Sequence, residues 1–163
     1  YPGVYTFTPV APSEYVDVNT KTVAVLDGVH GGTAYSADAA DVSLEATYSD
    51  KLKEAALDSA KEFLNSCASI PGNQNPDCPS ALNSDAVSAI SVKTMPTTLE
   101  PMDVDPGVFQ GQVTFAVTYS DKSYMPGTRD VDATVVVNVQ FAKDGTLKLT
   151  PEGTPDFWVG TSR

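Results

Sequence analysis

The sequence is short of the residues on which most nucleic-acid-binding and membrane-binding surfaces depend. It holds ten Lys and Arg residues against 21 Asp and Glu residues, which gives a net charge of -11. Nucleic acids and anionic membranes are bound through clusters of Lys and Arg, so we expect neither as a partner. No apolar run approaches the roughly 20 residues that span a bilayer, so we also expect no direct membrane insertion by this segment.

Catalytic residues are equally scarce. A Ser–His or Cys–His nucleophilic pair would have to use His30, the only histidine, which lies in the glycine-flanked loop "DGVHGGT". No G-x-S-x-G motif accompanies it, and neither of the glycine motifs that cradle phosphate occurs. We interpret His30 as an exposed loop residue and predict no catalytic residues, no cofactor and no enzymatic activity.

Two acidic pairs leave other chemistry open. Asp103 with Asp105, and Asp130 with Asp132, could supply oxygen ligands for calcium or the acid and base of a glycosidase. No twelve-residue EF-hand loop is present, and a single Trp offers little for an aromatic cleft that binds sugars. The favoured interpretation is that these carboxylates face solvent, and we predict no metal site.

The two cysteines, Cys67 and Cys78, stand at either end of the loop "CASIPGNQNPDC". A zinc site needs about four ligands, and the chain offers only these two thiols and the distant His30. Redox sites usually show C-x-x-C rather than ten intervening residues. We therefore predict a structural disulfide, which is typical of an oxidising, extracytoplasmic compartment.

The residues before Cys67 have the 3.6-residue periodicity of an amphipathic helix. Ser49 or Asp50 is a suitable N-cap, and Pro71 and Gly72 end the helix. The side chains expected on its buried face are Leu52, Ala56, Ala60, Phe63, Leu64 and Cys67.

Strand patterns lie on both sides of this helix. Short β segments are predicted before it, in "VYTFTPV", "KTVAVLDG" and "DVSLEATY". After it, "AVSAISVKT", "VFQGQVTFAVTYSD", "DVDATVVVNVQFAKDG" and "DFWVG" are predicted strands, and the two long ones alternate apolar and polar residues as in an antiparallel sheet. Asp144-Gly145 predicts a type I′ hairpin turn, whereas the Pro-rich "MPTTLEPMDVDPG" predicts a loop.

These elements predict an α+β fold in which one amphipathic helix packs on an antiparallel β-meander, as in cystatin-like and NTF2-like folds, with additional N-terminal β segments. We favour a single domain over residues 1–163, with a possible division into 1–45 and 46–163. The apolar face of the sheet is expected to fill the space beneath the helix with Phe63, Phe109, Phe115, Val117, Val135, Val137 and Phe141.

The polar face of the two long strands is unusual because its amides and hydroxyls are uncharged in so acidic a chain. An ordinary solvated face, which stays a valid alternative, usually carries Glu and Lys. We interpret this face as a possible binding face for a ligand or a neighbouring domain. Its residues are Gln110, Gln112, Thr114, Thr118, Thr134, Asn138 and Gln140.

Two passages, "YPGVYTFTPVAPSEYVDVNTKTVAV" and "FLNSCASIPGNQNPDCPS", resemble the extracytoplasmic regions of membrane-anchored cell-envelope proteins from actinobacteria. The resemblance covers roughly the first half of the chain. It implies a location outside the membrane and the Cys67–Cys78 bridge, and it implies no activity. The chain begins without an initiator Met or a signal-like segment, so we expect a mature or excised piece of a longer protein.

We therefore expect a non-enzymatic extracytoplasmic domain of a cell-envelope protein, with a structural, sensory or binding role. Its expected partners are another envelope protein or domain, or a glycan. The alternative is an NTF2-like domain that binds or hydrolyses a small molecule or glycan in a pocket between the helix and the sheet.

Overall fold

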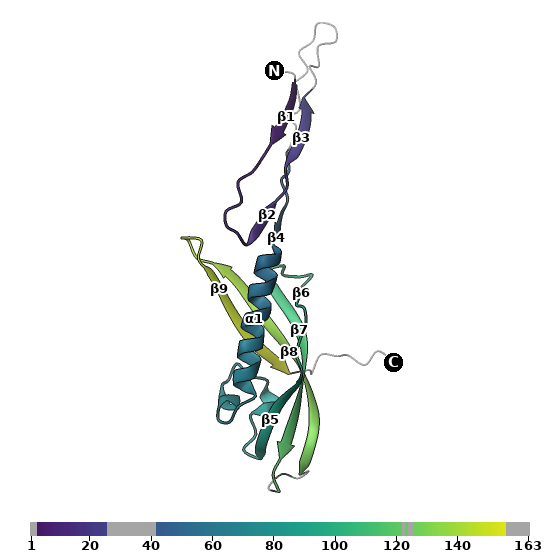
Figure 1. The fold of residues 1–163 in the computed structure, drawn as a ribbon, viewed down its shortest axis with the longest axis vertical. Coiled ribbons are helices and arrows are strands. Elements are labelled where there is room, and N and C mark those ends of the chain that lie inside the picture. Colours follow the sequence, from purple (N-terminus) through teal and green to yellow (C-terminus); the bar gives the residue numbers. More distant parts are fainter. Residues whose placement is uncertain (1–2, 26–41, 122, 124–125, 156–163) are drawn as a thin grey trace, which may run out of the picture. The chain divides into compact units, whose positions relative to one another are not determined.

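The computed structural model describes residues 3–25, 42–121, 123 and 126–155 (Figure 1). The chain divides into two compact units, Tyr1–Leu52 and Lys53–Arg163. The single α-helix of the described residues, α1 (Asp50–Cys67), begins in the first unit and continues into the second, and two short 3-10 helices follow it, η1 (Gly72–Gln74) and η2 (Ser80–Leu82). All described strand pairs are antiparallel, so the chain has the predicted α+β class.

The first unit is built from two narrow β ribbons. Strand β1 (Gly3–Phe7) pairs with β3 (Lys21–Val25), and β2 (Val16–Val18) pairs with β4 (Ala46–Tyr48). Strand β2 was not predicted from the sequence, because its three residues are too few to show a period. Val4, in β1, is 72% exposed, and none of the described side chains in these four strands is buried.

Ser49 fixes the start of α1. Its Oγ accepts a hydrogen bond from the Leu52 N–H at 3.3 Å, which makes Ser49 the N-cap. The same hydroxyl donates to the Glu14 carbonyl at 2.9 Å, and the Ser49 N–H donates to the Tyr15 carbonyl at 3.0 Å. Lys51 forms an ion pair with the Glu14 side chain, in which its Nζ donates a hydrogen bond to Glu14 Oε2. This hydrogen bond lowers the pKa of the Glu14 carboxyl. The loop before β2 is thereby tied to the first turn of the helix.

The second unit places α1 across the concave side of a curled sheet (Figure 1). The helix stripe that the sequence predicts is confirmed, since all but one of its members are fully buried and Phe63 is half-buried. Two of the buried positions are alanines. The fully buried members are Leu52, Ala56, Ala60, Leu64 and Cys67.

Four strands form the body of this sheet, in the order β5–β7–β8–β9, and a fifth short strand, β6, pairs with the other end of β7. The Pro-rich segment predicted to be a loop therefore contributes β6 to the sheet, beside β7. The bounds are β5 Val87–Thr94, β6 Glu100–Pro101, β7 Val108–Tyr119, β8 Gly127–Phe141 and β9 Leu147–Pro155.

Cys67 and Cys78 are bonded, with their Cα atoms 5.7 Å apart, so the predicted disulfide is present. It closes a loop with a sequence separation of 11 residues, which is worth about 3 kcal/mol of stability in the chain-entropy model. Inside the loop, the buried Asn73 donates from Nδ2 to the Leu82 carbonyl at 2.7 Å. The bridge thus holds a compact loop to the C-terminal end of α1.

The β8–β9 turn differs from the predicted type I′ geometry. A type I′ turn needs positive φ at two successive residues, and here only Gly145 has it, with φ of +83°. The Gly145 N–H donates to the Ala142 carbonyl, and the Ala142 N–H donates to the Thr146 carbonyl. This is a type I turn followed by a left-handed glycine, a common three-residue hairpin loop. Asp144 stays out of the left-handed region, and its Oδ1 accepts from the Thr146 N–H, which lowers the pKa of the Asp144 carboxyl.

Candidate docking face

The space between α1 and the sheet is filled by side chains. Of the seven residues expected to fill it, five are buried with at most 1% exposure, and Phe63 is half-buried. The prediction that Phe141 is buried there is wrong. Phe141 lies at the end of β8 next to the hairpin turn and is 39% exposed. The five buried residues are Phe109, Phe115, Val117, Val135 and Val137.

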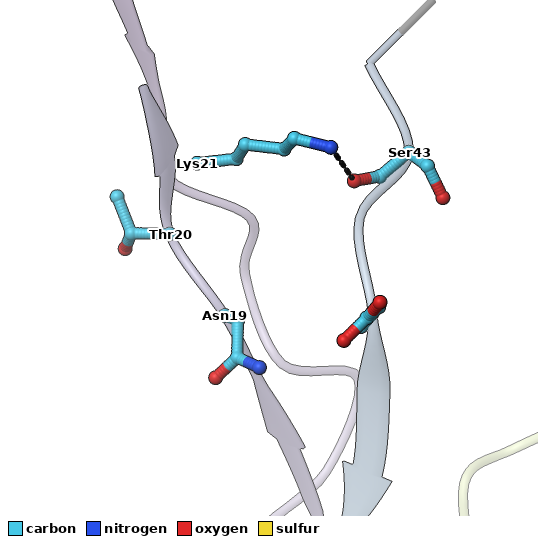
Figure 2. A pocket seen from close by; sticks show the side chains of 5 residues that line it. Asn19, Thr20, Lys21 and Ser43 are labelled. Atoms are coloured by element: carbon cyan, nitrogen blue, oxygen red, sulfur yellow. Dashed lines mark hydrogen bonds between the residues drawn. The ribbon is translucent and has the colours of Figure 1, made fainter. Parts of the chain in front are cut away.

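A small pocket occurs in the first unit, between the β2–β3 connection with the start of β3 and the segment that precedes β4. Its volume is about 180 Å³, below the range of about 300–1,000 Å³ usual for ligand sites. In Figure 2 the Lys21 side chain reaches across the gap, and its Nζ donates to the Ser43 carbonyl at 3.2 Å, while Thr20 points away from Ser43. All lining residues are polar and exposed, so no apolar residue lines this pocket. They are Asn19, Thr20, Lys21, Ser43 and Glu45.

The β9 edge of the sheet offers few hydrogen-bond donors to an incoming strand. Peptide groups alternate sides along a strand, so residues 151, 153 and 155 direct their backbone nitrogens away from β8. Pro151 and Pro155 have no N–H, and the Gly153 N–H is already bonded to the Asp77 carbonyl at 2.7 Å. At residues 151, 153 and 155 the free edge of β9 therefore has no available N–H, which is a common protection against unwanted strand pairing.

The opposite edge, β5, is protected differently. Its pairing with β7 is irregular between Val87 and Ala89 and again between Val92 and Thr94. Lys93 lies within the second irregularity and pairs with Asp130 on β8. Bulges and a charged residue are two further ways in which edge strands avoid pairing with another chain.

The convex side of the sheet, which we call the outer face, carries the even-numbered residues of β7 and β8. The pairing register puts Gln112 opposite Thr134, and Gln112 Nε2 donates to Thr134 Oγ1 at 3.0 Å. The structure thus brings the predicted binding residues onto one face, where each is half-buried or exposed. They are Gln110, Gln112, Thr114, Thr118, Thr134, Asn138 and Gln140.

One end of the outer face is charged, because Asp130 and Asp132 lie on the same side of β8 as Thr134. Thr114 lies opposite Asp132 and donates to its Oδ1 at 2.7 Å. Next to it, Asp130 is paired with Lys93. Thr114 and Thr118 therefore lie at this charged end of the face and are already hydrogen bonded to β8, Thr118 through the Thr128 hydroxyl at 2.8 Å.

The other end of the outer face is neutral and contains two valines. Val108 lies opposite Asn138, and Val136 lies opposite Gln110; both valines are half-buried. The sequence predicts that both valines lie on this face, because each is an even number of residues away from the predicted amides along its strand. We call this surface the neutral patch: Val108, Gln110, Gln112, Thr134, Val136 and Asn138.

The amides of this region are available for binding. Within the described residues, the side chains of Gln110, Asn138 and Gln140 make no hydrogen bond to the protein. Charged residues border the patch on the flanking strands: Glu100 lies beside Gln110 on β6, and Glu152 lies beside Val136 on β9. The arrangement of apolar side chains within a polar border resembles that of a protein interface.

The other candidate groups are dispersed. His30 and the predicted strand at residues 156–160 lie outside the described residues. Asp103 and Asp105 are in the loop between β6 and β7, far in register from Asp130 and Asp132, and Asp105 Oδ1 accepts from the Gly107 N–H. In the part of the chain that the structure describes, no three His, Cys, Asp or Glu residues are grouped as metal ligands. Nor does this part contain a helix of the length and apolarity needed to cross a membrane.

The chain matches no protein-family model, no curated protein and no solved structure.

Proposed function

We propose that this chain is a non-enzymatic extracytoplasmic module of the cell envelope that works by docking through the neutral patch. One observation carries the proposal: the helix side of the sheet is filled, whereas the outer face presents two half-buried valines among uncharged amides. The partner class is another envelope protein or domain, or a glycan.

The location outside the cytoplasm is part of the same proposal. The Cys67–Cys78 bridge supports it, because structural disulfides persist in oxidising compartments. The resemblance of the first half of the chain to envelope proteins of actinobacteria supports it as well. The net charge of -11 is in keeping with a protein that stays dissolved near an anionic surface rather than binding it.

We also propose that the second unit is a variant of the cystatin-like or NTF2-like arrangement. One helix lies on the concave side of a curled antiparallel sheet, which supports this assignment (Figure 1). In such a variant the space beneath the helix serves as core, because aromatic and β-branched side chains occupy it. A ligand pocket at that place is therefore not part of the proposal.

The test is site-specific photo-crosslinking in an actinobacterial host that exports the chain. A photoreactive residue replaces Gln112 in the neutral patch or, as the matched control, the exposed Gln74 in the disulfide loop. We expect covalent adducts from position 112 and none from position 74 after irradiation of intact cells. Equal adducts from both positions, or none from 112, contradict the proposed function.

A further inference from the structure

We infer that the partner of the neutral patch is a second copy of this chain, so that two sheets stack by their outer faces around a twofold axis. The inference rests on the proposed function, since it assigns an occupant to the same surface. It concerns Val108, Gln110, Gln112, Thr134, Val136 and Asn138.

The first argument is the hydrogen-bonding chemistry of the patch. A twofold interface brings a surface against itself, so the surface must be complementary to its own copy. Amides and hydroxyls each donate and accept, so Gln110, Gln112 and Asn138 can bond to the same groups of a second copy. A carboxylate surface lacks this property because ionised carboxylates only accept.

The second argument is charge. Two chains of net charge -11 repel each other, and the repulsion is strongest where carboxylates meet. The six residues of the neutral patch carry no charge, so identical chains that meet there bring no like charges of the patch itself into contact. The border has both signs, with Glu100 and Glu152 beside the patch and Lys148 opposite Gln140.

The third argument is the state of the sheet edges. Self-association of β proteins often occurs by edge-to-edge strand pairing. Here β9 has no free N–H at residues 151, 153 and 155, and β5 is irregular and carries Lys93. Stacking of faces avoids these obstructed parts of the two edges, and Val108 with Val136 supplies its apolar centre.

Sedimentation equilibrium of the purified 163-residue chain tests the inference. We expect a monomer–dimer equilibrium, and the double variant Gln112→Lys with Asn138→Lys weakens dimerisation at least about tenfold. The matched control, Asn65→Lys with Gln74→Lys, adds the same charge at exposed positions on α1 and in the disulfide loop and leaves the dimer intact. Equal melting temperatures verify that both variants are folded.

Ionic strength supplies a second readout that misfolding does not imitate. Because the chains carry like charge, raising the NaCl concentration from about 0.05 to 0.5 M strengthens the dimer by screening the repulsion. A wild-type chain that is monomeric at all concentrations, or a dimer that the patch variant leaves unchanged, overturns the inference. If position 112 still gives adducts in cells while the purified chain is monomeric, the docking function stands and the occupant is a different envelope molecule.

Discussion

At the scale of single residues, Ser49 makes two hydrogen bonds that alanine cannot make. Its hydroxyl caps α1 and also donates to the Glu14 carbonyl. We expect Ser49→Ala to lower the free energy of unfolding by about 1 kcal/mol or slightly more, the usual cost of losing an N-cap. Urea denaturation followed by the helical circular dichroism signal measures it.

Two comparisons separate capping from a general effect of removing a serine. Ser49→Thr keeps both hydrogen bonds and is expected to retain most of the stability. Ser66→Ala removes an exposed hydroxyl that bonds only back to the Phe63 carbonyl within the helix, and it is expected to cost little. A Ser66→Ala variant less stable than Ser49→Ala would show that the cap does not hold the start of the helix.

At the scale of elements, the end of the disulfide loop and the Pro79 that follows it rest against β9 at Gly153. A Cβ on Gly153 would lie 2.4 Å from Cδ and 2.7 Å from Cγ of Pro79, whose ring cannot move without its backbone. A Cβ on Gly111 would lie 2.6 Å from Cδ2 of Leu99, the far end of a flexible side chain. Gly153→Ala is therefore expected to cost about 1–3 kcal/mol by overpacking, and Gly111→Ala less.

Urea denaturation of the two glycine variants side by side measures this difference. If Gly111→Ala is the more damaging substitution, the disulfide loop does not pack on β9 as the structure has it. The comparison also probes the edge protection, because the Gly153 N–H donates to the Asp77 carbonyl in the same loop.

The elements that the sequence predicts well are those in which a periodic pattern of apolar residues repeats several times. The stripe of α1 and the alternation of β7 and β8 extend over several turns or residue pairs, so single exceptions do not obscure them. By contrast, β9 reads as interrupted because Pro151 and Pro155 cannot donate to a neighbouring strand. The strand order shows that the nitrogens of both prolines face away from β8, at the free edge of the sheet, where the lack of an N–H breaks no ladder hydrogen bond. This order depends on contacts between residues that are distant in sequence.

The candidate face was predictable in part for the same reason. Parity along the two long strands places the amides together, but it does not tell which flanking strands border them. Lys93 comes from β5, and Glu152 comes from β9, so the charges around the face depend on tertiary pairing. Val136 had the right parity for the outer face, although its apolar side chain suits the core as well.

At the scale of the whole molecule, the account assigns different tasks to the two sides of one sheet. The concave side and α1 form the buried core, while the convex side carries the neutral patch. Side-chain amides occur both in the patch and elsewhere on the chain, so they can report which surface meets a partner. Asn65, Gln74 and Asn83 are exposed amides away from the patch.

Nuclear magnetic resonance of the nitrogen-labelled chain during dilution is therefore the most direct measurement of the central claim. The account predicts that the side-chain amide signals of Gln110, Gln112 and Asn138 move with concentration, while those of Asn65 and Gln74 stay fixed. Signals that move at Asn65 or Gln74 while the patch amides stay fixed, or no movement of any of these signals, would contradict the claim that two copies of this chain stack by their outer faces.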